Sequence, residues 1–307
     1  MRKFGFATAC GLNSASASST LLCLFMPVAK GATDIPETRS GPPEMLRRRI
    51  LTAVVALFVL AVVLFVLPAV AARAVIAILL LGSAWEWSGF IFRNVPNRRI
   101  LYLLFIAALM AAVFAGMPDA KLVDLVLKIA LGWWLAALAW MFFFPTPIPN
   151  PLAWVCGVLV IVPAWLSLDY LYLKSPKLLL FALLIVWIAD IGAYFVGKGF
   201  GRVKLAPRIS PGKTWEGVLG GLCAVMVLAA MGSQVLEINI EVLIPFCLAV
   251  AMLSIVGDLT VSMFKRNAGL KDSGTLFPGH GGILDRIDSV SAAAPLFALA
   301  LNWIGLQ

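Results

Sequence analysis

The residues best suited to chemistry lie in one short segment, "SMFKRNAGLKDSGTLFPGHGGILDRIDS", which covers 262–289. Carboxylate oxygens are ligands for Mg²⁺, while ammonium, guanidinium and backbone N–H groups bind phosphate oxygens. This combination of residue types is typical of phosphoryl chemistry, although opposite charges so close together could also simply neutralise one another. The ionisable side chains of the segment are Lys265, Arg266, Lys271, Asp272, His280, Asp285, Arg286 and Asp288.

Glycines and a single histidine add to this pattern. Histidine can transfer protons near neutral pH, and His280 lies close in sequence to Asp285, but a hydrogen-bonded loop residue is the alternative interpretation. A covalent hydrolase is disfavoured, because the chain has no Gly-x-Ser-x-Gly motif and no cysteine beside a base. The residues whose backbone can approach an anion closely are Gly274, Pro278, Gly279, Gly281 and Gly282.

The rest of the chain is far more apolar than a soluble protein. Of its 307 residues, 62% are hydrophobic and 13% are charged, whereas soluble domains are roughly 45 to 50% apolar and about 25% charged. Apolar runs of about 20 residues, long enough for a helix to cross a bilayer, recur along it. We therefore predict an all-α, polytopic membrane bundle of about nine transmembrane helices. The expected spans are 50–71, 74–92, 100–116, 122–143, 152–168, 178–196, 217–235, 241–261 and 290–305.

Lysines and arginines between the spans predict the orientation of the bundle. When the spans are threaded alternately, one side receives most of these cations, including the Arg47–Arg49 run, Lys213 and Lys265, while the other side receives few, such as Arg73. Because cytoplasmic loops of membrane proteins are enriched in cations, the N-terminus and both charged loops are expected in the cytoplasm. The net charge of +9 is explained by these cytoplasmic loops. No nucleic-acid partner is expected, because the basic residues do not form one patch.

Residues 1–44 differ from the rest in being rich in Ser, Ala, Thr, Gly and Pro. We interpret them as a disordered extension, or as the result of a start codon assigned too early, with Met45 as the first residue. A cleaved signal peptide is disfavoured, because it would leave Arg47–Arg49 outside the membrane. Residues 45–307 are expected to form one membrane-embedded domain, with its catalytic part at about 186–307.

Carboxylates at similar depth near the cytoplasmic face predict where the site lies. Asp190 and Asp258 fall near the cytoplasmic ends of the sixth and eighth spans, and Asp285 and Asp288 begin the last span on one helical face. Carboxylates are costly at this depth unless they are paired, bind an ion or face water. We expect them to converge, with a salt bridge or a helix cap as the alternative for each, above all for Asp288 beside Ser289.

Two further features are expected on the same side. Glu86, in "AWEW" near the cytoplasmic end of the second span, could support the site or bond a neighbouring helix. Lys213 belongs to the basic loop between the sixth and seventh spans, which can meet the 262–289 segment. The "SPGKT" of this loop is similar to the end of a P-loop, but the upstream glycine is missing at the required spacing and no strand is expected before it. The P-loop interpretation is therefore rejected.

Together these motifs resemble the signature of the phosphatidate cytidylyltransferase family, also called CDP-diacylglycerol synthases. The resemblance covers residues 45–307 and rests on "SMFKR", "KD" and "PGHGGILDRID" at fixed spacing, with support from "ADIGAYFVGKGFG", "KLAPRISPGKTWEG" and "AWEW". It implies transfer of the cytidylyl group of CTP to phosphatidic acid, which gives CDP-diacylglycerol and pyrophosphate for phospholipid biosynthesis. It also implies the bacterial inner membrane, with the active site on the cytoplasmic side.

The resemblance assigns roles to individual residues. Asp258 and Asp285 are implied as Mg²⁺ ligands, with a monovalent cation such as K⁺ and a homodimer as further options. Charge neutralisation on the α-phosphate and on the departing pyrophosphate is the main chemical requirement, because the lipid phosphate is already an anionic nucleophile. The implied catalytic residues are Asp190, Asp258, Lys265, Arg266 and Asp285, and the implied substrate-binding residues are Lys213, Lys271, Asp272, His280, Gly281, Gly282, Arg286 and Asp288.

Other functions stay open at this point, among them a cytidylyltransferase for a different lipid phosphate. A CTP-dependent polyprenol or dolichol kinase would use a related lipid but would transfer the γ-phosphate. A cation-coupled transporter would line its path with Asp190, Asp258 and Asp285 and would not depend on CTP. It also predicts inverted internal repeats, which we do not find in the sequence.

Overall fold

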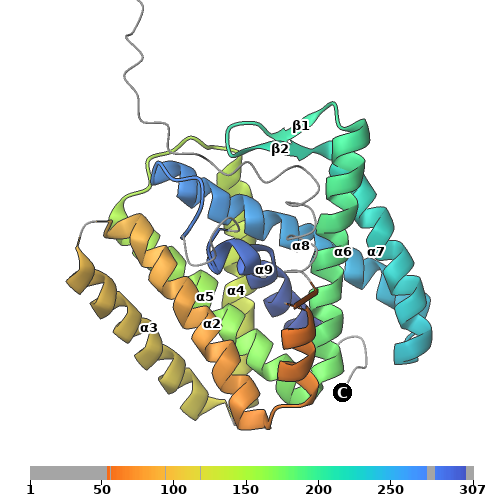
Figure 1. The fold of residues 1–307 in the computed structure, drawn as a ribbon, viewed down its shortest axis with the longest axis horizontal. Coiled ribbons are helices and arrows are strands. Elements are labelled where there is room, and N and C mark those ends of the chain that lie inside the picture. The colour runs from red at the N-terminus through yellow and green to blue at the C-terminus, as the bar shows by residue number, and fades with distance from the viewer. Residues whose placement is uncertain (1–53, 56, 94, 118, 275–280, 302–307) are drawn as a thin grey trace, which may run out of the picture. The chain divides into compact units, whose positions relative to one another are not determined.

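The computed structural model describes residues 54–55, 57–93, 95–117, 119–274 and 281–301, and these residues are mainly helical (Figure 1). The described part of the chain contains two strands, β1 (Lys204–Ala206) and β2 (Ser210–Thr214), between α6 and α7. The helices are α2 (Ala69–Ile91), α3 (Pro96–Gly116), α4 (Ala120–Met141), α5 (Asn150–Lys174), α6 (Pro176–Phe200), α7 (Trp215–Leu236), α8 (Ile240–Asn267) and α9 (Leu284–Ala300).

Helices α2 to α8, 7 in all, are long and apolar enough to cross a membrane. The prediction of a helical, multi-pass membrane protein is therefore confirmed. Helix α9 begins at Leu284, ahead of the predicted span 290–305, so Asp285 and Asp288 lie in its first turns. The first and last predicted spans extend beyond the described residues, and the total of about nine stays a prediction.

An ion pair between α2 and α5 corrects two of the predicted boundaries. We placed Arg73 between the first two spans and ended the fifth span at 168. In the structure α2 already begins at Ala69 and runs through Arg73, and α5 continues to Lys174. The Arg73 guanidinium donates two hydrogen bonds of 2.7 Å to the Asp169 carboxylate, one to each oxygen. Because each charge satisfies the other, neither residue needs to end its helix, and Arg73 is not a loop residue.

The connection between α6 and α7 is an antiparallel hairpin, which the all-α prediction did not include. Lys204 pairs with Thr214, and Ala206 pairs with Ser210. The "SPGKT" segment is therefore strand β2, and the expectation that no strand precedes it was wrong, because β1 does. The segment is extended instead of forming a loop around an anion. It ends at Thr214, whose Oγ1 accepts a 3.2 Å hydrogen bond from the Gly217 N–H and caps α7.

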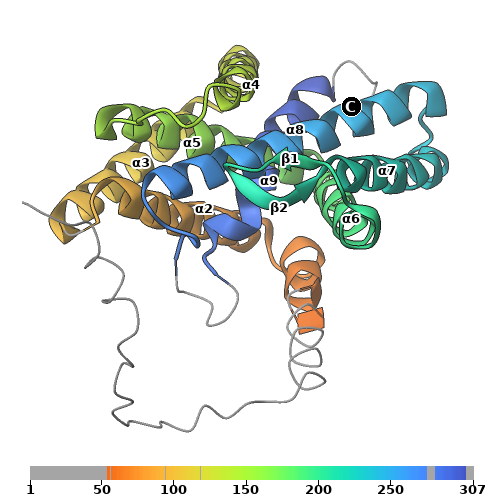
Figure 2. The ribbon, with the colours of Figure 1, turned by 90° about the horizontal axis from the view of Figure 1, so that it is seen from above.

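Glycines bring the helices that carry the predicted site close together. A Cβ on Gly217 would lie 2.8 Å from the Ala193 carbonyl oxygen of α6, and a Cβ on Gly257 of α8 would lie 2.5 Å from the Asp288 carbonyl oxygen of α9. Neither position therefore has room for a larger side chain. Figure 1 and Figure 2 both place the β1–β2 hairpin next to α8. Close packing thus brings together elements that lie far apart in sequence.

Candidate active site

An ion pair joins the hairpin to α8. Lys213 of β2 places its Nζ 2.5 Å from Asp258 Oδ2, and each side chain is 25% exposed. Ser262, one turn further along α8, donates a 3.1 Å hydrogen bond to Asp258 Oδ1. Both oxygens of this carboxylate therefore have a donor, and one of the donors comes from a segment about 45 residues earlier in the chain.

A second ion pair joins α8 to α9. Lys265 Nζ lies 2.7 Å from Asp285 Oδ1, with side chains that are only 10% and 13% exposed. Asp285 Oδ2 accepts two backbone hydrogen bonds of 3.0 Å each, from the N–H groups of Ser273 and Gly282. Gly281 has a φ of +80°, and a Cβ there would lie 2.8 Å from Asp285 Oδ2. The turn before α9 therefore depends on glycine and is held against this carboxylate.

Asp190 and Asp288 belong to the same electrostatic cluster. Asp190, on α6, interacts with Lys213 and Asp258. Asp288 is buried, accepts a 2.8 Å hydrogen bond from the Ser289 N–H, and interacts with Lys213, Asp258 and Lys265. The structure thus brings together six residues that the sequence singled out, from α6, β2, α8 and α9. We call this group the charged cluster, and its members are Asp190, Lys213, Asp258, Lys265, Asp285 and Asp288.

Other predicted site residues are not members of the charged cluster. The Arg266 guanidinium donates to the carbonyl oxygens of Ile209, at 3.2 Å, and Leu270, at 3.4 Å, so it ties the hairpin to the end of α8. Lys271 and Asp272 are exposed in the segment after α8. The remaining predicted residues are Gly281 and Gly282 in the turn at Asp285, Arg286, which is exposed in the first turn of α9, and His280, which lies outside the described residues.

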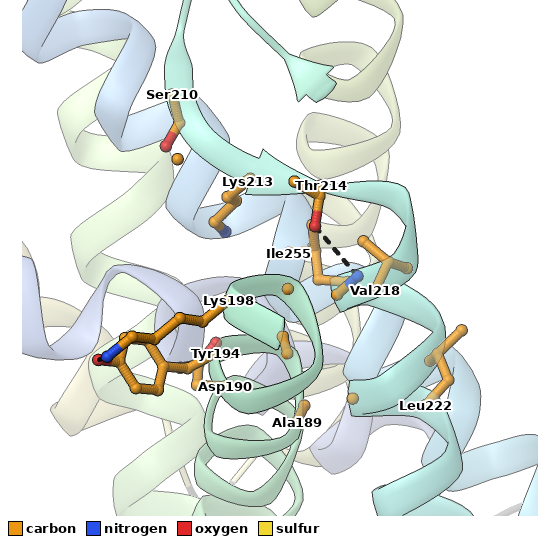
Figure 3. Close-up of a pocket in the computed structure, with 15 residues that line it drawn as sticks. Ala189, Asp190, Tyr194, Lys198, Ser210, Lys213, Thr214, Val218, Leu222 and Ile255 are labelled. Carbon is orange, nitrogen blue, oxygen red and sulfur yellow. Dashed lines mark hydrogen bonds between the residues drawn. The ribbon is translucent and has the colours of Figure 1, made fainter. Parts of the chain in front are cut away.

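A cavity of about 520 Å³ opens beside the charged cluster, between α6, the hairpin and α7 (Figure 3). Asp190 from α6 and Lys213 from β2 both line it. Figure 3 shows Tyr194 and Lys198 extending side by side from α6, and Lys198 Nζ lies 3.5 Å from the Tyr194 hydroxyl. Small and aliphatic residues form much of the remaining wall, including Ala189, Ala193, Val218, Leu222 and Ile255. The cavity therefore combines an apolar wall with charged groups that reach the cluster.

Sequence reasoning gave little weight to two residues beside the cluster. Glu86 of α2 bonds the segments on both sides of residues 275–280, and its sequence signals were an acid inside an apolar span and its place in "AWEW". Ser273 donates its hydroxyl to Glu86 and its backbone N–H to Asp285. A serine two residues after an exposed lysine carries no distinctive pattern, so only its contacts reveal it.

Asp258 and Asp285 are the residues that could hold a divalent cation. Among the described residues, no group of three or more His, Cys, Asp or Glu side chains is arranged to hold a metal ion. Mg²⁺ is usually held by one or two carboxylates together with waters and substrate phosphates, and not by an all-protein cage. Asp258 and Asp285 supply hard oxygens of the kind that this mode of binding uses, and in the structure each of them contacts an ammonium group.

Known proteins match this chain over most of its length. The model of the Cytidylyltransferase family matches residues 47–304. A phosphatidate cytidylyltransferase of Pseudomonas aeruginosa is 42% identical over 271 residues, which cover 84% of this chain and 97% of the relative. One of Haemophilus influenzae is 38% identical over 288 residues, which cover 83% of this chain and 98% of the relative. These matches confirm the resemblance inferred from the motifs.

Proposed function

The chain belongs to the cytidylyltransferase family, and from this premise we propose that it transfers the cytidylyl group of CTP to phosphatidic acid. The products are CDP-diacylglycerol and pyrophosphate. The observation that carries the proposal is the charged cluster, in which Lys213 and Lys265 are each held by a carboxylate and Lys213 also lines a cavity with an apolar wall. The phosphates of the nucleotide and of the lipid need cations, and the acyl chains of the lipid need an apolar surface. A site for both substrates must therefore offer cations next to an apolar wall.

The reaction itself asks for little acid–base chemistry. An oxygen of the lipid phosphate forms a bond to the α-phosphorus of CTP, and the bond from this phosphorus to the bridging oxygen of the β-phosphate breaks. Pyrophosphate leaves with that electron pair, and no proton has to be removed from the nucleophile. The obstacle is repulsion between two polyanions, which fixed cations in a partly dry site reduce most effectively.

Lys213 and Lys265 are the cations we assign to the phosphate oxygens. Their carboxylate partners, Asp258 and Asp285, keep them extended toward the cluster before substrates bind. Arg266 contributes by holding the hairpin, and therefore Lys213, against α8 through the Ile209 carbonyl. We retain the other predicted substrate-binding residues as proposals, namely Lys271, Asp272, His280, Gly281, Gly282, Arg286 and Asp288.

We assign Mg²⁺ to Asp258 and Asp285, and retain a second, monovalent cation such as K⁺ as a further proposal. Bound there, Mg²⁺ would neutralise charge on the phosphates and align them for displacement. The role of the chain is to supply the two carboxylates from different helices, α8 and α9, and to fix each with a lysine and further donors. Asp190 adds negative charge at the cavity side of the cluster.

We place the site at the cytoplasmic face of a bacterial inner membrane, in a bundle of about nine transmembrane helices with a cytoplasmic N-terminus. The charge bias of the loops supports this orientation, and CTP is then available on the same side. A cysteine introduced at the exposed Lys204 of β1 should react with an impermeant thiol reagent only from the cytoplasmic side. A homodimer, also retained as a proposal, can be tested by the mass of the purified detergent complex.

Radiolabelled CTP tests the proposed reaction directly. Label at the α-phosphate should enter the lipid fraction, and the incorporation should require both phosphatidic acid and Mg²⁺. Label at the γ-phosphate should stay in the aqueous fraction as pyrophosphate. Transfer of the γ-label to lipid would instead show a kinase, and the absence of any CTP-dependent lipid product would remove the proposed activity.

A further inference from the structure

Glu86 is a buried acid that the proposed reaction does not use. It lies near the end of α2 and is 5% exposed. Its Oε2 accepts 2.8 Å hydrogen bonds from the Ser273 hydroxyl and the Leu284 N–H, and its Oε1 accepts a 3.0 Å hydrogen bond from the Ile283 N–H. Both oxygens of this carboxylate are therefore occupied by donors from the protein itself.

Two glycines lie directly against the Glu86 carboxylate, where a larger residue would not fit. A Cβ on Gly274 or on Gly282 would overlap with the Glu86 carboxylate. The carboxylate therefore lies between the segment that follows α8 and the segment that precedes α9, and both segments approach it with glycine. An anion inserted so closely between two backbone segments fixes the distance between them.

Asp285 holds the same two segments from the opposite helix. Its Oδ2 accepts hydrogen bonds from the Ser273 N–H and the Gly282 N–H. Ser273 thus bonds Asp285 through its backbone and Glu86 through its side chain. The two carboxylates bond the same two backbone segments, although α2 and α9 are almost 200 residues apart in sequence.

We propose that Glu86 is a positioning residue, which fixes the backbone on both sides of residues 275–280 and thereby sets the place of Asp285 and its partner Lys265. The proposal rests on the proposed function, because it makes α2 a support of the cytidylyl-transfer site. Glu86 touches no reacting atom. It acts through Ser273 and through the Ile283 and Leu284 N–H groups.

Glu86→Gln tests this proposal, since glutamine keeps the volume but turns one acceptor oxygen into an NH₂ group. That group faces N–H or O–H donors in either orientation of the amide. We expect kcat to fall roughly ten- to a hundredfold, as for a catalytic group displaced by about 1 Å, with little change in the KM for phosphatidic acid. Ser273→Ala removes one of the three donors and should give a smaller loss. Combined with Glu86→Gln it should add less than its own effect.

Asp169→Asn is the matched control, because Asp169 is also a buried carboxylate bonded between helices, and its partner Arg73 is likewise on α2. We expect it to lower the thermal midpoint while leaving the kcat of the folded protein unchanged. A Glu86→Gln protein that is merely less stable, with wild-type kcat, would reduce Glu86 to a packing residue.

Hydrogen exchange separates failure of this inference from failure of the proposed function. In full-length protein in detergent, Glu86→Gln should speed the exchange of backbone amides at 273–274 and 282–288, whereas Asp169→Asn should not. If the wild-type protein forms no lipid product from CTP, the proposed function fails, and the exchange result still decides the role of Glu86. Unchanged exchange in Glu86→Gln would overturn the inference.

Discussion

Replacement of Asp285 by asparagine should remove most of the activity without unfolding the protein. Asp285 Oδ1 accepts from Lys265 Nζ at 2.7 Å, and Oδ2 accepts from the Ser273 and Gly282 N–H groups at 3.0 Å. Asparagine has one acceptor oxygen and one NH₂ group. In one orientation the NH₂ faces an ammonium, and in the other it faces two N–H groups, so donors oppose donors in both.

The size of the effect follows from the burial of this pair. Breaking a buried ion pair costs about 3 to 5 kcal/mol, and the side chains of Lys265 and Asp285 are 10% and 13% exposed, which favours the lower end of that range. If about 3 kcal/mol is lost from the transition state, the rate falls roughly 100- to 200-fold. Loss of the proposed Mg²⁺ ligand would add to this figure.

The assay is incorporation of label from the α-phosphate of CTP into lipid by the purified protein, with folding followed by thermal unfolding and size exclusion. Asp124→Asn is the control, since Asp124 pairs with Lys128 on the surface of α4 with 47% of its side chain exposed. This control should change stability by less than about 1 kcal/mol and leave turnover unchanged. An Asp285→Asn protein that keeps wild-type turnover would refute the assignment of Asp285 to the site.

Three further substitutions test the hairpin, the turn before α9 and the helix bundle. Lys213→Ala should lower kcat/KM for CTP by about tenfold or more, measured with labelled CTP; unchanged kinetics would make the hairpin merely structural. Gly282→Ala should reduce turnover because its Cβ has no room, whereas Gly199→Ala, whose Cβ would meet nothing within 4 Å, should be neutral in the same assay. Arg73→Leu should lower the free energy of unfolding by about 3 kcal/mol, because it leaves Asp169 buried and unpaired; thermal unfolding in detergent with an unchanged midpoint would contradict this.

The fold could be predicted from the sequence wherever apolar runs were uninterrupted. The two boundary errors involve the two partners of one ion pair, since Arg73 was placed between spans and the fifth span was ended at 168, one residue before Asp169. A hydropathy pattern counts each charge separately, but a bidentate pair satisfies both inside the bundle. Only knowledge that α2 and α5 are neighbours could have revealed that the two charges cancel. The hairpin was missed for a different reason, because its strands are only 3 and 5 residues long and show no clear alternation of apolar and polar residues.

For the site, the residue types and their expected depth in the membrane predicted which side chains would come together. They did not predict which of these side chains would pair. The sequence placed Asp190, Asp258, Asp285 and Asp288 at one face, and the structure describes them in one electrostatic cluster. The sequence could not predict that Lys213 would pair with Asp258, because that contact depends on how the hairpin folds against α8. The supporting role of Glu86 also required the fold, because its partners are backbone N–H groups, which every sequence contains.

The balance of charge in the cluster gives a reason for a metal ion that is independent of family membership. Among the described residues, the charged cluster as defined above holds four carboxylates, Asp190, Asp258, Asp285 and Asp288, and two ammonium groups, Lys213 and Lys265. If all four carboxylates are ionised, negative charge remains in this group of six after each lysine is paired, and this remaining charge would oppose the approach of a triphosphate. We therefore expect the nucleotide to bind well only when it brings a cation with it. Binding of CTP and binding of Mg²⁺ should for this reason be strongly coupled, each raising the affinity for the other.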